Sequence, residues 1–183
     1  MTHRTTFASR LRVLTGIALV GLLSACSTID RGTAPALETN ASWAVLPFEN
    51  HTETPMAGNR AAAIATALIN ARGVGQVKRY TGDALQETLF DGREAKRRED
   101  ALAWARGEGV RYALTGAVDE WRYKVGVDGE PAVGVTLEIV DVGTGATVWS
   151  GAGAQSGWSR EALAAVGQKL IRNLLGTGLA NAR

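Results

Sequence analysis

The spacing of apolar and polar positions divides the chain into a leader, an irregular stretch and a folded body. A short apolar run over 43–48, which Pro47 ends because it cannot donate a ladder hydrogen bond, predicts the first strand. Apolar residues then recur at helical spacing up to Gly73, and Thr54 followed by Pro55 is typical of a helix start. The body therefore opens with a strand and a helix.

Near Tyr112 the apolar period changes from that of helices to that of strands. Before this point, Asp91 and Glu94 resemble a capping box for a helix that stops near Gly107. The other predicted elements are a strand over 76–80, a helix over 83–90, strands over 112–123, 133–142 and 146–155, and a helix over 159–176. These elements predict a single compact α/β (α+β) domain in the order β-α-β-α-α-β-β-β-α, with a mixed central sheet of about five strands, antiparallel hairpins and flanking helices.

The leader has the layout of an export signal. Arg4, Arg10 and Arg12 precede an apolar stretch over 13–23, which is too short for a membrane-spanning helix of about 20 residues. The sequence Leu-Ser-Ala-Cys that ends at Cys26 resembles the cleavage site of bacterial lipoproteins. This resemblance predicts a diacylglycerol thioether on Cys26 and an acylated amine, and two or three acyl chains anchor a protein stably.

The predicted organisation follows from that cleavage site. We expect a signal peptide over 1–25, a lipidated flexible tether over 26–42 and a periplasmic α/β domain over 43–183. The tether is rich in small polar residues and has no apolar period. In lipoproteins of this type an aspartate after the cysteine favours the inner membrane, and this chain has Ser27 there. We therefore expect a lipid anchor on the periplasmic face of the outer membrane.

Composition and charge argue against several functions. Cleavage removes three basic residues and no acidic ones, which leaves 17 basic against 18 acidic residues and no basic footprint for nucleic acid. His51 is then the only histidine and Cys26 the only cysteine, so the sequence offers no metal spacing and no base for an activated nucleophile. We expect neither a cofactor nor an enzyme.

The segment from Trp43 to Pro55, WAVLPFENHTETP, carries a family resemblance. Followed by an Ala-rich helix and the residues over 71–74, it resembles the PelC family, the outer-membrane lipoproteins of Pel exopolysaccharide secretion systems. The turn over 141–145 that leads into Val148-Trp149 is similar to a wider group of periplasmic domains, which includes CsgG and LpoB.

The PelC resemblance implies a homo-oligomeric ring, expected to be a dodecamer, under the outer membrane. It also implies a partner, the β-barrel exporter PelB, and a cationic, amino-sugar-rich polymer that is secreted into the biofilm matrix. The ring would guide this polymer through a negatively charged lumen. Such a lumen is compatible with a nearly neutral subunit, because a carboxylate repeated around a ring concentrates negative potential in a narrow opening.

Six carboxylates are candidates for guiding the polymer. Asp128 and Glu130 come first, since the connection that carries them between two strands can project from a ring. The others lie at strand ends or in a turn, and they are Asp119, Glu120, Glu138 and Asp141. The alternative for each is an ordinary solvated side chain.

Trp149 is the candidate for membrane contact. It shares a strand face with Gly151 and Gly153, so it either protrudes toward the membrane interface or fills a groove in the core. Two alternative functions also remain open: a regulator that binds a cell-wall synthase, like LpoB, and a secretion pore, like CsgG. Oligomeric state separates a ring from a monomeric regulator.

Overall fold

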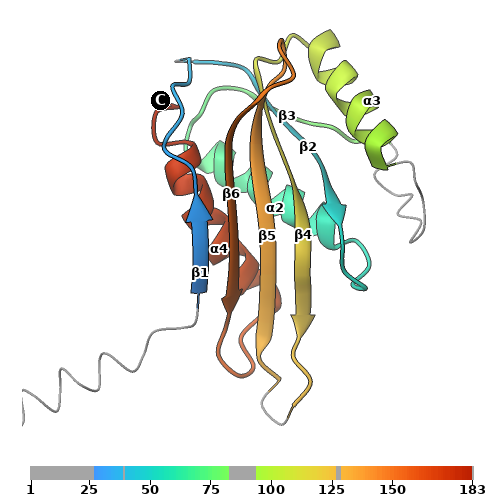
Figure 1. The fold of residues 1–183 in the computed structure, drawn as a ribbon, viewed down its shortest axis with the longest axis vertical. Coiled ribbons are helices and arrows are strands. Elements are labelled where there is room, and N and C mark those ends of the chain that lie inside the picture. The colour runs from blue at the N-terminus through green and yellow to red at the C-terminus, as the bar shows by residue number, and fades with distance from the viewer. Residues whose placement is uncertain (1–26, 39, 83–93, 127–128, 183) are drawn as a thin grey trace, which may run out of the picture.

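The computed structural model describes residues 27–38, 40–82, 94–126 and 129–182 of the 183-residue chain (Figure 1). Six strands and three helices lie in these residues. They are β1 (Ser27–Arg31), β2 (Trp43–Asn50), α2 (Ala57–Ala71), β3 (Val77–Arg79), α3 (Glu94–Gly107), β4 (Tyr112–Tyr123), β5 (Pro131–Asp141), β6 (Thr147–Ser156) and α4 (Leu163–Gly178). The predicted helix over 83–90 and the capping residue Asp91 lie outside the described residues.

The six strands form one mixed sheet in the order β1-β6-β5-β4-β2-β3. β2 runs parallel to β3 and β4, whereas the pairs β4–β5, β5–β6 and β1–β6 are antiparallel. The long hairpins arise because alternating apolar residues of β4 and β5 face one side of the sheet. The predicted fold class, a compact α+β domain with a mixed sheet, is confirmed.

Two helices cover one face of the sheet. α2 and α4 lie behind the strands in Figure 1 and bury the main core, which includes Trp43, Trp121 and Leu170. α3 packs near the opposite face, where Ala101 and Ala105 belong to a smaller cluster with strand residues such as Leu46. The strands therefore separate a thick helical layer from a face that is covered only in part.

The first residues of the predicted tether form a strand, β1, instead of a flexible segment. Residues 27–31 pair with β6 from Ser27 opposite Gln155 to Arg31 opposite Gly151. Their sequence has a single apolar residue, Ile29, which packs against the main core, so alternation could not signal the strand. The strand forms because β6 offers the main-chain hydrogen bonds of a free sheet edge. The prediction of a flexible tether is wrong for this segment.

The starts of two helices also differ from the predictions. α2 begins at Ala57, after Met56 in a left-handed conformation, and Thr54 does not cap it because its hydroxyl donates to the carbonyl of Trp121. α4 begins at Leu163, because Arg160 has φ 63° and a left-handed residue cannot continue a helix from Ser159.

β2 continues past Pro47 to Asn50. The register with β4 shifts between Val45 and Phe48, and the freed carbonyl of Pro47 accepts a hydrogen bond from the Thr115 hydroxyl at 3.0 Å. The shift accommodates a proline inside a paired strand, where an unbroken ladder would need its missing N–H.

Candidate functional site

One end of the molecule joins the start of β1 to exposed apolar side chains. Ser27, the residue after Cys26, lies opposite Gln155 near the end of β6. Trp158 follows Gln155 by three residues in the sequence. The loop between β6 and α4 and the hairpin between β4 and β5 lie at this same end, at the bottom of Figure 1. We call it the anchor end. Cys26, the predicted site of lipidation, lies outside the described residues, but Ser27, which follows it in the sequence, is held against the folded body.

Among the described residues, three large apolar side chains are exposed at the anchor end. Val125 is fully exposed, Trp158 is 60% exposed and Tyr123 is 49% exposed. Glu161 holds Trp158 in place by accepting a hydrogen bond from its backbone N–H at 3.1 Å, and a hydrogen bond from Lys169 is the main reason that the pKa of Glu161 is lowered. The sequence does not single out these three residues, because their position relative to Ser27 depends on strand pairing.

Trp149 does not contact a membrane from the subunit surface. It is only 3% exposed, and its indole N–H donates to the carbonyl of Gly32 at 3.2 Å. A Cβ added at Gly178 of α4 would lie 2.9 Å from its ring. The prediction of membrane contact by Trp149 is wrong, because α4 closes over the glycine-lined groove that holds the ring.

Asp141 stabilises the turn of the hairpin between β5 and β6. One carboxylate oxygen accepts a hydrogen bond from the backbone N–H of Thr144 at 3.0 Å, and the other lies 2.6 Å from Arg111. The Thr144 hydrogen bond and then the Arg111 guanidinium lower the pKa of this carboxyl group. Asp141 is only 7% exposed and stabilises the turn, which leaves little of its carboxylate accessible for the predicted role of guiding a polymer.

Glu138 and Glu120 are paired with arginines. Glu138 on β5 accepts a hydrogen bond from Arg98 of α3 at 2.7 Å, which holds α3 near the sheet. Glu120 accepts one from Arg122 of the same strand at 3.0 Å. Each carboxylate therefore has a cation beside it, which weakens its field at a distance.

Asp119 and Glu130 are the more exposed candidates. Their side chains are 48% and 49% exposed, and Lys124 stands 3.8 Å from Glu130, beyond hydrogen-bond distance. Glu130 lies at the anchor end, and Asp128 in the same hairpin lies outside the described residues. The five candidates among the described residues are thus spread over several sites, and the fold does not gather them into one cluster.

Asp119 belongs to a small network around His51. The Nδ1 atom of His51 is 3.0 Å from Asp119, its Nε2 atom is 3.3 Å from Glu49, and Asp119 also accepts a hydrogen bond from Thr136 at 3.1 Å. The hydrogen bond with Asp119 is the main cause that raises the pKa of His51, and Glu49 raises it further. The network links β2, β4 and β5 on the face of the sheet opposite α2 and α4.

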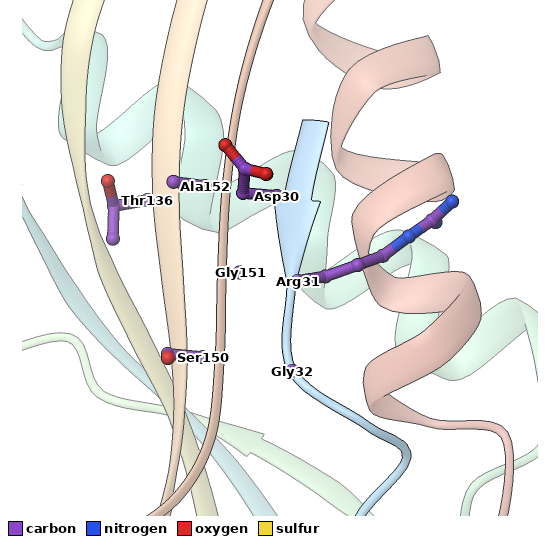
Figure 2. A pocket seen from close by; sticks show the side chains of 7 residues that line it. All are labelled: Asp30, Arg31, Gly32, Thr136, Ser150, Gly151 and Ala152. Carbon is purple, nitrogen blue, oxygen red and sulfur yellow. The ribbon is translucent and has the colours of Figure 1, made fainter. Parts of the chain in front are cut away.

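A shallow groove of about 390 Å³ lies on the same face, between β1 and β6 (Figure 2). Asp30, Thr136 and Ser150 supply its polar atoms, and Ala152 lies on its floor. Arg31 extends away from it toward α4, where it donates to Asn173 at 2.9 Å. The groove is open to solvent and combines a carboxylate and two hydroxyl groups with glycine and alanine, so it suits a protein surface rather than a buried small molecule.

The described residues contain no group of three or more His, Cys, Asp or Glu side chains placed to hold a metal ion. In the same part of the chain, none of the helices is long and apolar enough to cross a membrane.

Together these features define a class of protein: a small α+β domain with one face covered by helices, one face partly open, and an exposed apolar end. Two solved structures are similar to the chain over nearly all of their length. The PelC dodecamer from Paraburkholderia phytofirmans in space group P6 is 41% identical, with 83% of this chain and 96% of that chain covered and a TM-score of 0.70. A single-residue variant of that dodecamer, in space group C2, is 40% identical, with 84% and 98% covered and a TM-score of 0.72. The chain belongs to the PelC family, as the residues over 43–55 predicted.

A more distant likeness extends to the LpoB C-terminal domain from Salmonella enterica. It is 22% identical, with 66% of this chain and 86% of that chain covered, and its TM-score of 0.43 is too low to bear on function. No protein-family model and no curated protein sequence matches the chain.

Proposed function

We propose that this chain is a lipid-anchored, ring-forming component of a Pel exopolysaccharide export system. In this role it stands at the periplasmic face of the outer membrane and guides a cationic polymer toward the β-barrel exporter PelB. The observation that carries the proposal is the 40–41% identity to PelC dodecamers over almost their entire length. Identity at this level favours a shared assembly as well as a shared fold.

The anchor end supports an orientation for the ring. A lipid on Cys26 would be joined to the body without a flexible linker, because Ser27 is already paired with Gln155. Acyl chains inserted in the membrane then bring Trp158, Tyr123 and Val125 to its surface, where aromatic side chains are favoured. Trp158 replaces Trp149 as the proposed membrane-contact residue.

The charges support a guiding role near the exit of the ring. Glu130 lies at the anchor end with 49% of its side chain exposed and Lys124 3.8 Å away, and Asp128 precedes it by two residues in the sequence. Repetition of the hairpin between β4 and β5 around a ring would place many carboxylates beside the exporter. A polymer with protonated amino groups would be attracted to that opening.

Charge reversal in the hairpin tests the proposed function. In a polymer-secreting strain, D128K together with E130K should reduce the polymer found outside the cells several-fold, while protein abundance and membrane fractionation stay unchanged. The matched control is E99K with D100K, which makes the same change of charge on exposed positions of α3. Unchanged secretion by the hairpin variant would remove these two residues from the guiding path.

The anchor is tested separately. C26S should move the protein from the membrane fraction to the soluble periplasmic fraction, because the thiol that carries the diacylglycerol is gone. W158A, with the lipid retained, should weaken retention on washed membranes without loss of fold. A protein that remains in the membrane fraction as C26S would contradict the lipid anchor.

A further inference from the structure

The face of the sheet opposite α2 and α4 carries a continuous row of small and acidic residues. Strand register places them directly opposite one another on neighbouring strands, and paired residues point to the same face. The row, which crosses five strands from β1 to β2, consists of Asp30, Ala152, Thr136, Ala117 and Glu49. We call this surface the open face. Its β6 residues Ser150, Ala152 and Ala154 are exposed.

The open face accepts close approach by another protein surface. Ala152, Ala154 and Gly134 have side chains of one carbon or none, so a neighbour can come within a few ångströms of the strands. The groove of about 390 Å³ adds a hollow in which a neighbouring side chain can sit. Figure 2 shows Asp30 beside this hollow, and Arg31 of the same strand turns away from it to α4.

The two broad sides of the subunit differ in their charged residues. The open face holds Asp30 and Glu49 in its central row, with Asp119 beside them, and His51 lies 3.0 Å from Asp119 and 3.3 Å from Glu49. On the other side, α2 and α4 contain no acidic residue at all. Their charged residues are Arg60, Lys169 and Arg172, and all three are exposed.

A closed ring needs two different, complementary patches on each copy. In a head-to-tail ring, one patch of each subunit meets the other patch of the next, whereas a two-fold dimer uses one patch twice. The open face, with Asp30 in its row, and the helix side, with exposed cations and no acidic residue on α2 or α4, fit that requirement. The dodecameric state of the similar PelC structures shows that this fold supports a ring.

We propose that each copy in the ring packs the outer side of its α2 and α4 onto the open face of the next copy. The occupant of the groove is thus a second copy of this chain, and the helix cations approach Asp30 and its neighbours. This inference rests on the ring of the proposed function, and it assigns the surfaces from which that ring is built.

Variants on each side of the subunit test the contact. The purified, lipidated protein in detergent is measured by native mass spectrometry, after the wild type has been shown to form a ring. A152R, which places a bulky cation on the open face, should convert rings to monomers, with at least a tenfold loss of ring at matched concentration. R60E with R172E, which reverses charge on both helices, should also shift the distribution to smaller species.

A matched control separates a specific contact from a general effect of arginine. Ala103 is exposed on α3, outside the open face and the α2–α4 side, so A103R should leave the ring intact. The monomers of A152R should keep the wild-type circular dichroism spectrum, because Ala152 is exposed in the subunit. If A152R disturbs folding, D30R on the edge strand β1 serves as a second disruption of the same face.

The outcomes distinguish this inference from the proposed function. Rings of unchanged mass in A152R or D30R would overturn the assigned surfaces while leaving the ring itself in place. Equal loss of ring in A103R would also overturn them, because the open face would then have no special part. A wild type that stays monomeric in the lipidated form would overturn the ring of the proposed function.

Discussion

At the scale of single residues, the same residue type has opposite roles in this protein. Trp149 and Trp158 both lie close to glycines in the sequence, which gives no basis for separating them. Trp149 is 3% exposed beneath α4, whereas Trp158 is 60% exposed at the anchor end. The difference arises from what each meets in the fold: a helix closes over one side chain, and a loop carries the other outward.

Truncation of the two tryptophans should therefore have unequal effects. W149A removes a large buried side chain and should lower the free energy of unfolding by about 3–5 kcal/mol, which corresponds to a drop in Tm on the order of 10 °C. W158A should change the Tm little, because a mostly exposed ring loses little burial. Thermal unfolding followed by circular dichroism checks both, and a small loss in W149A would contradict the buried position.

His51 should make stability depend on pH. Its pKa is raised above 6.5 in the folded state, chiefly by the hydrogen bond with Asp119. The stabilising contribution is therefore fully present below pH 6.5 and is lost as pH rises through the higher folded pKa. Urea unfolding of the wild type and H51Q at several values between about pH 6 and 8.5 should show the difference between them shrink as pH rises. A constant difference over this range would show that the pair with Asp119 does not depend on the charge of His51.

At the scale of elements, close contacts of backbone decide how helices lie on the sheet. Gly58 in the first turn of α2 packs so closely on β2 that a Cβ there would lie 2.3 Å from the carbonyl oxygen of Phe48. Gly167 of α4 leaves room for the ring of Trp121 in the same way. Small residues on the helices thus set the distance between the helical layer and the strands.

G58A should be destabilising although alanine is the better helix former. The added methyl group must push α2 away from Phe48, and overpacking of this kind costs about 1–3 kcal/mol. G107A at the end of α3 is the matched control, since a Cβ there meets nothing within 4 Å and the substitution should be neutral or slightly stabilising. Equal Tm values for the two variants would show that the contact of α2 with β2 relaxes at no cost.

At the scale of the whole molecule, helices cover one side of the subunit's sheet, and the other side is partly exposed. α2 and α4 close the core, while the open face and the exposed residues of the anchor end face outward. An exposed apolar end beside the predicted lipid attachment point suits a membrane surface, and a polar sheet face of small residues suits another protein. Both features are explained by a subunit that works in an assembly.

The lipidated protein should accordingly be a large, uniform species. Native mass spectrometry in detergent should give a ring near twelve copies, as in the similar PelC structures, and electron-microscope classes should show a closed outline. The measurement is repeated over a hundredfold range of concentration to exclude loose association. A strict monomer at every concentration would favour the alternative of a monomeric lipoprotein regulator.

Strong periodicity predicted the elements that carry the core. The alternation in β4 and β5 and the helical spacing in α2 and α4 were sufficient to predict those elements to within a few residues. β1 was missed because a single apolar residue, Ile29, gives no period. The helix starts were wrong because Met56 and Arg160 take left-handed conformations that their residue types do not indicate.

The candidate site was predicted only in outline. The sequence pointed to carboxylates in and around the hairpins, but the ion pair of Asp141 with Arg111 and that of Glu138 with Arg98 join residues far apart in the chain. No local pattern could separate those more buried groups from Glu130, which keeps 49% of its side chain exposed beside Lys124. The role of each carboxylate depends on the cation that the fold brings beside it.

By itself, the sequence determined the fold class, the family and the expected lipid anchor, because these depend on local signals: apolar period, turn residues and short motifs. The tertiary structure alone decided that residues 27–31 pair with β6, that Trp149 is buried, and that one side of the sheet stays partly open. Those facts depend on contacts between residues distant in the chain, and such contacts are set by the packing of whole elements.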